Sequence, residues 1–177
     1  MSTSLLVQNA IKHFTTYKGL ADKTFAQLSE EQMHYQPNDA CNNIAILIQH
    51  MSGNMLSRWT NFLTEDGEKP WRNRDTEFND QQLNKEQLLE LWEKGWKVLF
   101  DTLQSLKEED LSKDIFIRTE PQSVTDAIVR QIAHYCGHVG QIVMLGKIMK
   151  ADGWQPLSIA KGQSDAFNKM MEEKFGN

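Results

Sequence analysis

Residues 123–150, SVTDAIVRQIAHYCGHVGQIVMLGKIMK, carry the clearest helical pattern in this chain. Their apolar residues recur at three- and four-residue steps, which is the period of an α-helix with one buried face. The residues of that face are Val124, Ile128, Tyr135, Ile142, Leu145 and Met149. Ser123 and Asp126 have the spacing of an N-terminal cap, and the run 151–153, ADG, is typical of a helix end. This stretch therefore predicts one long helix with a buried stripe.

Three more stretches show the same period, and they predict long helices over residues 4–28, 43–63 and 84–107. A short fifth helix is expected over residues 164–174, and residues 115–117 are expected to form a short extended piece. The connector over residues 64–83 is unusually long, and such loops are functional or cross a whole domain. The sequence contains no internal repeat and no change of composition that would mark a second domain. We therefore expect one all-α domain over residues 1–177, a four-helix bundle.

Composition narrows the classes of function. The chain has 177 residues, a formal net charge of −5 and two cysteines. No basic stripe is present, so we expect no nucleic-acid partner. No apolar run has the length of a membrane span, and the first residues lack a secretory pattern, so we expect a cytoplasmic protein without membrane contact. Two cysteines do not make a disulfide framework.

Three histidines carry the chemistry that the sequence indicates. His134 and His138 are four residues apart, so in a helix both imidazoles lie on one face. His50 lies on the expected inner face of helix 43–63. If the two helices pack antiparallel, His50 and the pair lie at about the same height, roughly 20 Å from the shared end. Three imidazoles at one level predict a site for a divalent metal, although one histidine on an apolar face is more often a core residue.

Polar residues near the histidines are candidates to orient them. Gln131 and Gln141 lie on the strip of the histidine pair, and Asn54 follows His50 by one helical turn. Hydrogen bonds between helices would explain these amides equally well. Arg72, Arg74 and Lys161 are candidates to hold an anionic substrate or thiol at the mouth of the site. The alternative is that they form ion pairs on the surface with Asp75, Glu77 and their neighbours. No residue is assigned as catalytic.

A metal held by three neutral imidazoles keeps its full charge, and it would acidify either a bound water or a bound thiol. The sequence contains no nucleophile elbow, phosphate-binding loop or paired-cysteine motif. Three functions therefore remain open: transfer of a thiol to an electrophile, hydrolysis by metal-bound hydroxide, and non-enzymatic binding of a metal or ligand. The hydrolytic alternative lacks an obvious buried carboxylate that would serve as its general base.

At these histidines the chain resembles the DinB-like superfamily, which includes the YfiT-like metal-dependent hydrolases and the bacillithiol and mycothiol S-transferases. A closer resemblance, to a bacterial subfamily of that group, covers most of the chain. It rests on the runs 50–54 (HMSGN), 66–71 (DGEKPW), 74–78 (RDTEF), 134–142 (HYCGHVGQI) and 157–162 (LSIAKG).

The resemblance implies a bundle of up-down-down-up order, with a long crossover between the second and third helices. It also implies that His50, His134 and His138 are ligands of a divalent metal, nickel or zinc first and manganese or iron after them. A homodimer is a further implication. We therefore expect a metal-dependent enzyme of the thiol S-transferase type acting on a small molecule, with a low-molecular-weight thiol as cosubstrate.

Overall fold

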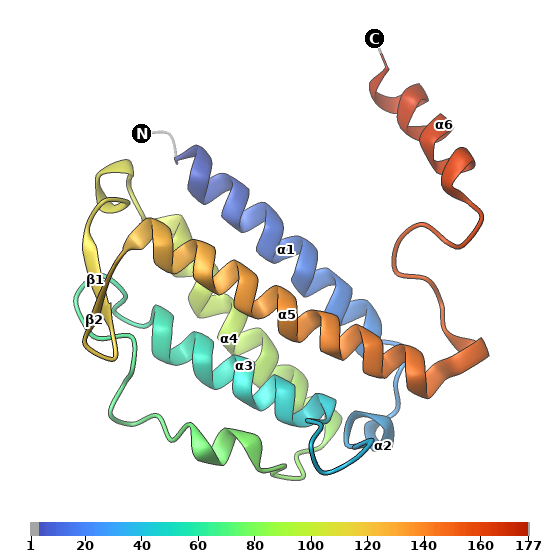
Figure 1. Ribbon diagram of the computed structural model, residues 1–177, viewed down its shortest axis with the longest axis horizontal. Helices are drawn as coiled ribbons and strands as arrows, with labels where there is room; N and C mark the ends of the chain where they lie inside the picture. Colours follow the sequence, from blue (N-terminus) through green and yellow to red (C-terminus); the bar gives the residue numbers. More distant parts are fainter. Residues whose placement is uncertain (1–3, 177) are drawn as a thin grey trace.

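The computed structural model describes residues 4–176, and the described chain is mostly helical (Figure 1). Its helices are α1 (Leu5–Phe25), α2 (Glu30–Met33), α3 (Ile44–Trp59), α4 (Lys85–Ser105), α5 (Val124–Lys150) and α6 (Ser164–Phe175). Three short 3-10 turns complete the helical part: η1 (Asp75–Phe78), η2 (Glu108–Asp110) and η3 (Ala151–Gly153). The mostly helical class predicted from the sequence is confirmed.

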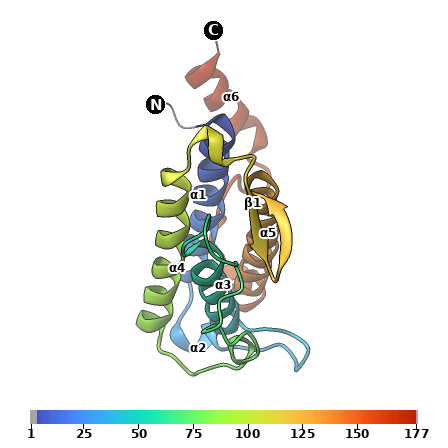
Figure 2. The same ribbon diagram turned by 90° about the vertical axis from the view of Figure 1, so that its left-hand side faces the viewer.

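Four of these helices, α1, α3, α4 and α5, are long and pack side by side. Figure 1 shows α1 and α5 running in one direction and α3 and α4 in the other. The closest pairs are α3 with α4 and α1 with α5. In the view of Figure 2, α4 and α5 lie on opposite sides, with α1 and α3 between them.

The shared core is apolar and rich in aromatic side chains. Phe14 of α1, Trp96 of α4 and Tyr135 of α5 are fully buried, and their ring centroids lie about 6 Å apart in each pair. Tilted and edge-to-face contacts at this distance are the favoured geometry for aromatic pairs. The core therefore fixes α5 relative to α1 and α4.

Some boundaries differ from the sequence prediction. The helix expected over 43–63 ends at Trp59, because Thr60 is extended and Asn61 is left-handed with φ 50°. The helix expected over 4–28 ends at Phe25, and a separate short α2 begins after Ser29. Ser29 and Gln32 form a reciprocal capping box, which starts a new helix there.

One short β-hairpin interrupts the helices of the otherwise all-α chain. Strands β1 (Asp114–Ile117) and β2 (Glu120–Ser123) form an antiparallel hairpin before α5. Residues 115–117 are part of the strand that begins it, as the extended piece expected there. The connector between α3 and α4 contacts this hairpin, since the Gly67 amide donates to the Phe116 carbonyl at 2.7 Å.

Helix α6 stands apart from the four long helices and contributes no buried residue (Figure 1). Among the described residues, no helix combines the length and apolar character that a membrane crossing requires. Residues 1–3 and 177 of the expected domain lie outside the described residues.

Candidate metal centre

The structure brings the three predicted histidines together. His50 extends from α3, and His134 and His138 extend from successive turns of α5. The Nε2 atom of His134 lies 3.4 Å from that of His50 and 3.0 Å from that of His138. All three ligand atoms lie within 4.8 Å of one another, and the group could hold a metal ion.

Each histidine is oriented by an oxygen acceptor at its other ring nitrogen. The Nδ1 of His50 lies 3.0 Å from a Glu77 carboxylate oxygen. The Nδ1 of His134 lies 3.2 Å from Gln131 Oε1, and the Nδ1 of His138 lies 2.9 Å from Gln141 Oε1. Acceptors at all three Nδ1 atoms favour the tautomer with the proton on Nδ1. The three Nε2 lone pairs are therefore free, and their atoms lie close enough together to share one cation.

This geometry fits a divalent cation. Metal–imidazole bonds of roughly 2.0–2.1 Å, at angles between 90° and tetrahedral, separate two nitrogens by about 2.9–3.4 Å. The two measured Nε2 separations lie in that range. Without a cation, the unprotonated nitrogens of these two close pairs would only repel each other. The donor set therefore matches a metal better than it matches a core of hydrogen-bonded histidines.

Burial keeps two of the three imidazoles neutral. Burial, together with the neighbouring His138 and His50, lowers the pKa of His134 from 6.5 to about 3. Burial also lowers the pKa of His138, against a raising effect of its hydrogen bond with Gln141. Both imidazoles are consequently unprotonated at neutral pH, the state that binds metals.

Glu77 is a site residue that the sequence analysis did not identify as one. It is 7% exposed, and the pKa of its carboxyl lies below its usual value. Burial would raise that pKa, but hydrogen bonds from Arg72 and His50 outweigh the effect. The Arg72 guanidinium donates to both Glu77 oxygens, at 2.7 and 2.8 Å. The ion pair between Arg72 and Glu77 is therefore buried beside the three histidines.

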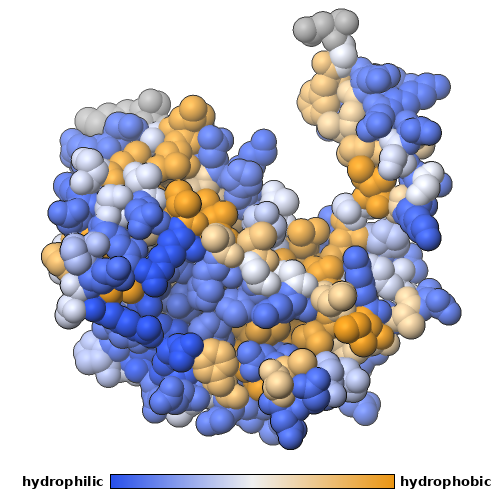
Figure 3. Space-filling view, in the orientation of Figure 1, coloured by the Kyte–Doolittle hydropathy of each residue, from blue (hydrophilic) through white to orange (hydrophobic). Residues whose placement is uncertain are grey.

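A cavity of about 460 Å³ opens over the histidines. Its lining consists of His50, Asn54, Arg58, Arg72, Arg74, Phe78, Arg118, Arg130, Gln131, His134 and His138. Asn54, Gln131 and Arg74 therefore lie at the cavity, as the sequence analysis expected of candidates for this site. Gln141 reaches the centre through His138. Figure 3 shows hydrophilic side chains gathered over this part of the molecule, on the left of the view.

Lys161 does not lie at this cavity. It lines a separate one, of about 340 Å³, with Trp154 and Pro156 after the end of α5. The segment that follows α5 runs toward α6 and away from the hairpin, so Lys161 cannot share the cavity with Arg74 (Figure 1). Two other cationic residues, Arg118 and Arg130, line the cavity together with Arg74, and the sequence analysis did not consider them.

A family of proteins of unknown function, DUF1572, matches residues 2–163, and the chain belongs to this family. The match includes both helices that carry the three histidines. No curated protein and no solved structure matches the chain.

Proposed function

We propose that this protein is a metal-dependent enzyme of the thiol S-transferase type, with the up-down-down-up four-helix fold of the DinB-like superfamily. The observation that carries the proposal is the convergence of three Nε2 lone pairs at the wall of a cavity large enough for a small molecule. Imidazole ligands favour zinc or nickel over harder cations such as magnesium.

The metal would be held by His50, His134 and His138. When bound there, a divalent cation lowers the pKa of a coordinated thiol, so that the thiol is deprotonated near neutral pH. Glu77, Gln131 and Gln141 hold the three imidazoles in the ligating tautomer through their Nδ1 atoms. Through these hydrogen bonds the three residues position the imidazoles.

Thiol transfer suits the cavity better than hydrolysis does. Among the described residues, no aspartate or glutamate lines the cavity, and Glu77 is already bonded to Arg72 and His50. Hydrolysis requires a base for its attacking water. In thiol transfer the cosubstrate supplies the nucleophile. Its thiol loses a proton to solvent, the thiolate sulfur forms a bond to the electrophilic carbon, and the leaving group departs with the electron pair of the bond that breaks.

Elemental analysis of protein purified without a histidine tag tests the metal site. We expect about one divalent metal per chain, lost in His138→Ala and retained in the control His13→Ala. His13 is an exposed histidine on α1, outside the cavity lining. A metal-free wild type, even after incubation with zinc or nickel, would contradict the site.

Thiol consumption tests the reaction. Metal-loaded protein should conjugate a model electrophile with at least one of bacillithiol, mycothiol, glutathione and coenzyme A, and His138→Ala should not. If thiols are not consumed but esters or amides are cleaved, and chelation abolishes the cleavage, the enzyme is a hydrolase instead. Tight binding of a metal without either activity would favour a metal-binding protein that is not an enzyme.

We also infer that the protein is a cytoplasmic homodimer with no nucleic-acid partner.

A further inference from the structure

Every arginine of this chain lines the metal cavity. The sequence contains five, Arg58, Arg72, Arg74, Arg118 and Arg130, and all five belong to the cavity wall. None of the 14 lysines is part of that wall. The arginines come from α3, the connector before η1, the hairpin turn and α5, so no single element accounts for the grouping. Arginine rather than lysine is the residue that binds carboxylate and phosphate groups through two parallel hydrogen bonds.

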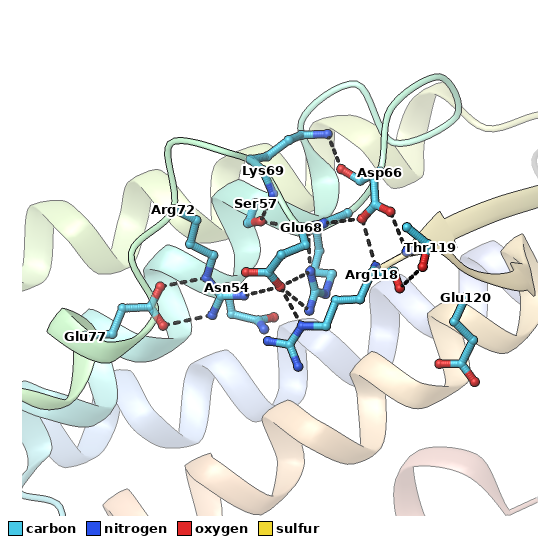
Figure 4. A network of polar contacts seen from close by, with 12 residues as sticks. Asn54, Ser57, Asp66, Glu68, Lys69, Arg72, Glu77, Arg118, Thr119 and Glu120 are labelled. Atoms are coloured by element: carbon cyan, nitrogen blue, oxygen red, sulfur yellow. Dashed lines mark hydrogen bonds and ion pairs between the residues drawn. The ribbon is translucent and has the colours of Figure 1, made fainter.

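The carboxylates near this wall do not neutralise it. One oxygen of Glu68 accepts hydrogen bonds from Arg58, Arg72 and Arg118 at 3.1 to 3.5 Å (Figure 4). Glu77 is shared between Arg72 and His50. Five guanidinium groups therefore have three carboxylate partners, Glu68, Glu77 and the exposed Glu120, in a protein whose net charge is −5.

The arginines at the mouth have the weakest anionic partners. Arg130 has only Glu120, 3.9 Å away and 69% exposed. Among the described residues Arg74 has no carboxylate partner, and its guanidinium lies over the Phe78 ring at 4.9 Å. Arg118 uses its Nε on Glu68, and its side chain is 55% exposed. Arg58 and Arg72 tie the connector to α3, and Arg118 ties the hairpin to the connector through its Nε alone. The rest of the Arg118 guanidinium, Arg74 and the weakly paired Arg130 are left for the cavity.

The neutral residues of the wall are also arranged as donors. The Trp59 indole can only donate, so the Tyr135 hydroxyl accepts from it at 3.2 Å and donates its own proton to Asn54 Oδ1 at 2.9 Å. That chain leaves the Asn54 amide nitrogen for the cavity. Gln131 likewise uses its oxygen on His134 and keeps its amide nitrogen. Apart from the histidine Nε2 atoms, the polar groups of the wall present hydrogen-bond donors.

We propose that this cavity binds a small molecule through an oxyanion, a carboxylate or phosphate group, held by Arg74, Arg118 and Arg130. The reactive end of the molecule then lies at the three histidines. The proposal rests on the proposed function for the identity of that molecule as a thiol or electrophile, but binding of the anion does not require turnover. A cavity of about 460 Å³ has the size of a small-molecule site.

Isothermal titration calorimetry at low ionic strength tests the proposal, with inorganic phosphate and succinate as probes and succinamide as the uncharged comparison. We expect phosphate or succinate to bind and succinamide not to bind. Arg74→Gln, Arg118→Gln and Arg130→Gln should each weaken binding by roughly tenfold, since each removes charge-assisted hydrogen bonds. Lys97→Gln, at an exposed lysine on α4, is the matched control and should have no effect.

The two probes distinguish the sources of the anion: a preference for phosphate indicates a phosphorylated ligand, and a preference for succinate indicates a carboxylate. The titrations are repeated on chelated protein, which separates this proposal from the metal-dependent function. Arginine-dependent binding in the chelated protein supports the proposal even if no thiol is ever transferred. Binding that needs the metal and is unchanged in all three arginine variants, or no binding of either probe, would overturn it.

Discussion

At the scale of single residues, the placement of Glu77 depends on a glycine. Gly53 follows His50 on α3, and a Cβ built there would lie 2.3 Å from Glu77 Oε1. Glu77 can therefore reach the Nδ1 of His50 only because residue 53 has no side chain. The helix accepts the cost of an interior glycine, about 1 kcal/mol relative to alanine, at this position.

Gly53→Ala should consequently displace the Glu77 carboxylate and loosen the orientation of His50. We expect metal affinity to fall by about tenfold or more, the usual effect of losing an outer hydrogen bond to a ligating histidine, with the helices still folded. Gly19→Ala on α1 is the control, because a Cβ there meets no atom within 4 Å. Metal titration and thermal unfolding measure both effects. Equal metal affinity in the two variants would mean that Glu77 does not orient His50.

At the scale of elements, the β1–β2 hairpin brings Arg118 to the cavity. Its two-residue turn, Arg118-Thr119, has φ values of 56° and 66°, in the left-handed region that turns of this kind need. Such turns are usually Asn-Gly, and a β-branched residue with positive φ is strained. Asp66 of the connector stabilises the turn by accepting the amides of Arg118 and Thr119 at 2.9 and 2.7 Å. The hairpin thus has an arginine at a left-handed turn position that asparagine or glycine would occupy with less strain.

Relief of this strain should separate stability from binding. Thr119→Gly should raise the free energy of unfolding by about 1 kcal/mol and leave anion binding intact, because Arg118 stays in place. Adding Arg118→Asn, to make an Asn-Gly turn, should keep the stability but weaken anion binding. Calorimetric unfolding and the titration with phosphate or succinate measure the two quantities. A less stable Thr119→Gly would show that the turn is not strained.

The far end of the connector is anchored by Asp80. One of its oxygens lies 2.7 Å from both His34 Nδ1 and Asn43 Nδ2, and the other accepts the Gln82 amide at 2.9 Å. Burial would raise the pKa of Asp80, but these hydrogen bonds outweigh it, so the pKa lies below its usual value of 3.8. The connector is therefore held at both ends by a carboxylate, Asp66 and Asp80.

The lowered pKa of Asp80 predicts that the fold loses stability at acid pH. A carboxyl whose pKa is lower in the folded state adds stability above pH 3.8, and the stability is lost as pH falls through the folded pKa. Asp80→Asn should therefore be less stable than the wild type near pH 7, and the difference should shrink as the pH falls below 3.8 and through the folded pKa of Asp80. Denaturant unfolding across this pH range measures it. A difference that stays constant with pH would mean that the charge of Asp80 does not contribute.

At the scale of the whole molecule, α6 is the helix that contributes nothing to the core. It has 12 residues and no buried side chain, and Met170, Met171 and Phe175 are exposed. A helix of this length is marginal in water without a packing partner. Figure 3 shows hydrophobic side chains on α6 and along the C-terminal half of α5, which are the surfaces a second copy of the chain could cover.

Deletion of residues 164–177 should therefore leave the unfolding temperature and the metal content unchanged, because the core and the cavity contain no residue of α6. We expect light scattering to show a dimer for the full chain and a monomer for the shortened one. The opposite result would be a full-length chain that is already monomeric and a shortened chain that unfolds at a clearly lower temperature. It would mean that α6 stabilises the core of its own chain.

The long helices and the shared face of His134 and His138 could be predicted because helical periodicity is a local property of the sequence. The meeting of His50 with that pair followed from helix lengths and one assumption, that the two helices are antiparallel. The hairpin, the buried Glu77 and the early end of α3 were not predictable in this way, since turns and irregular connectors have no period to read.

The sequence by itself therefore determined which faces of the helices are apolar and which of them carry imidazoles. Only the tertiary structure decided that a connector carboxylate orients His50, that Lys161 lies elsewhere, and that five arginines from four separate segments surround one cavity. The physical reason is that these contacts join residues far apart in the chain, through loops whose paths are set by hydrogen bonds to other elements. A pattern within one segment carries no information about such contacts.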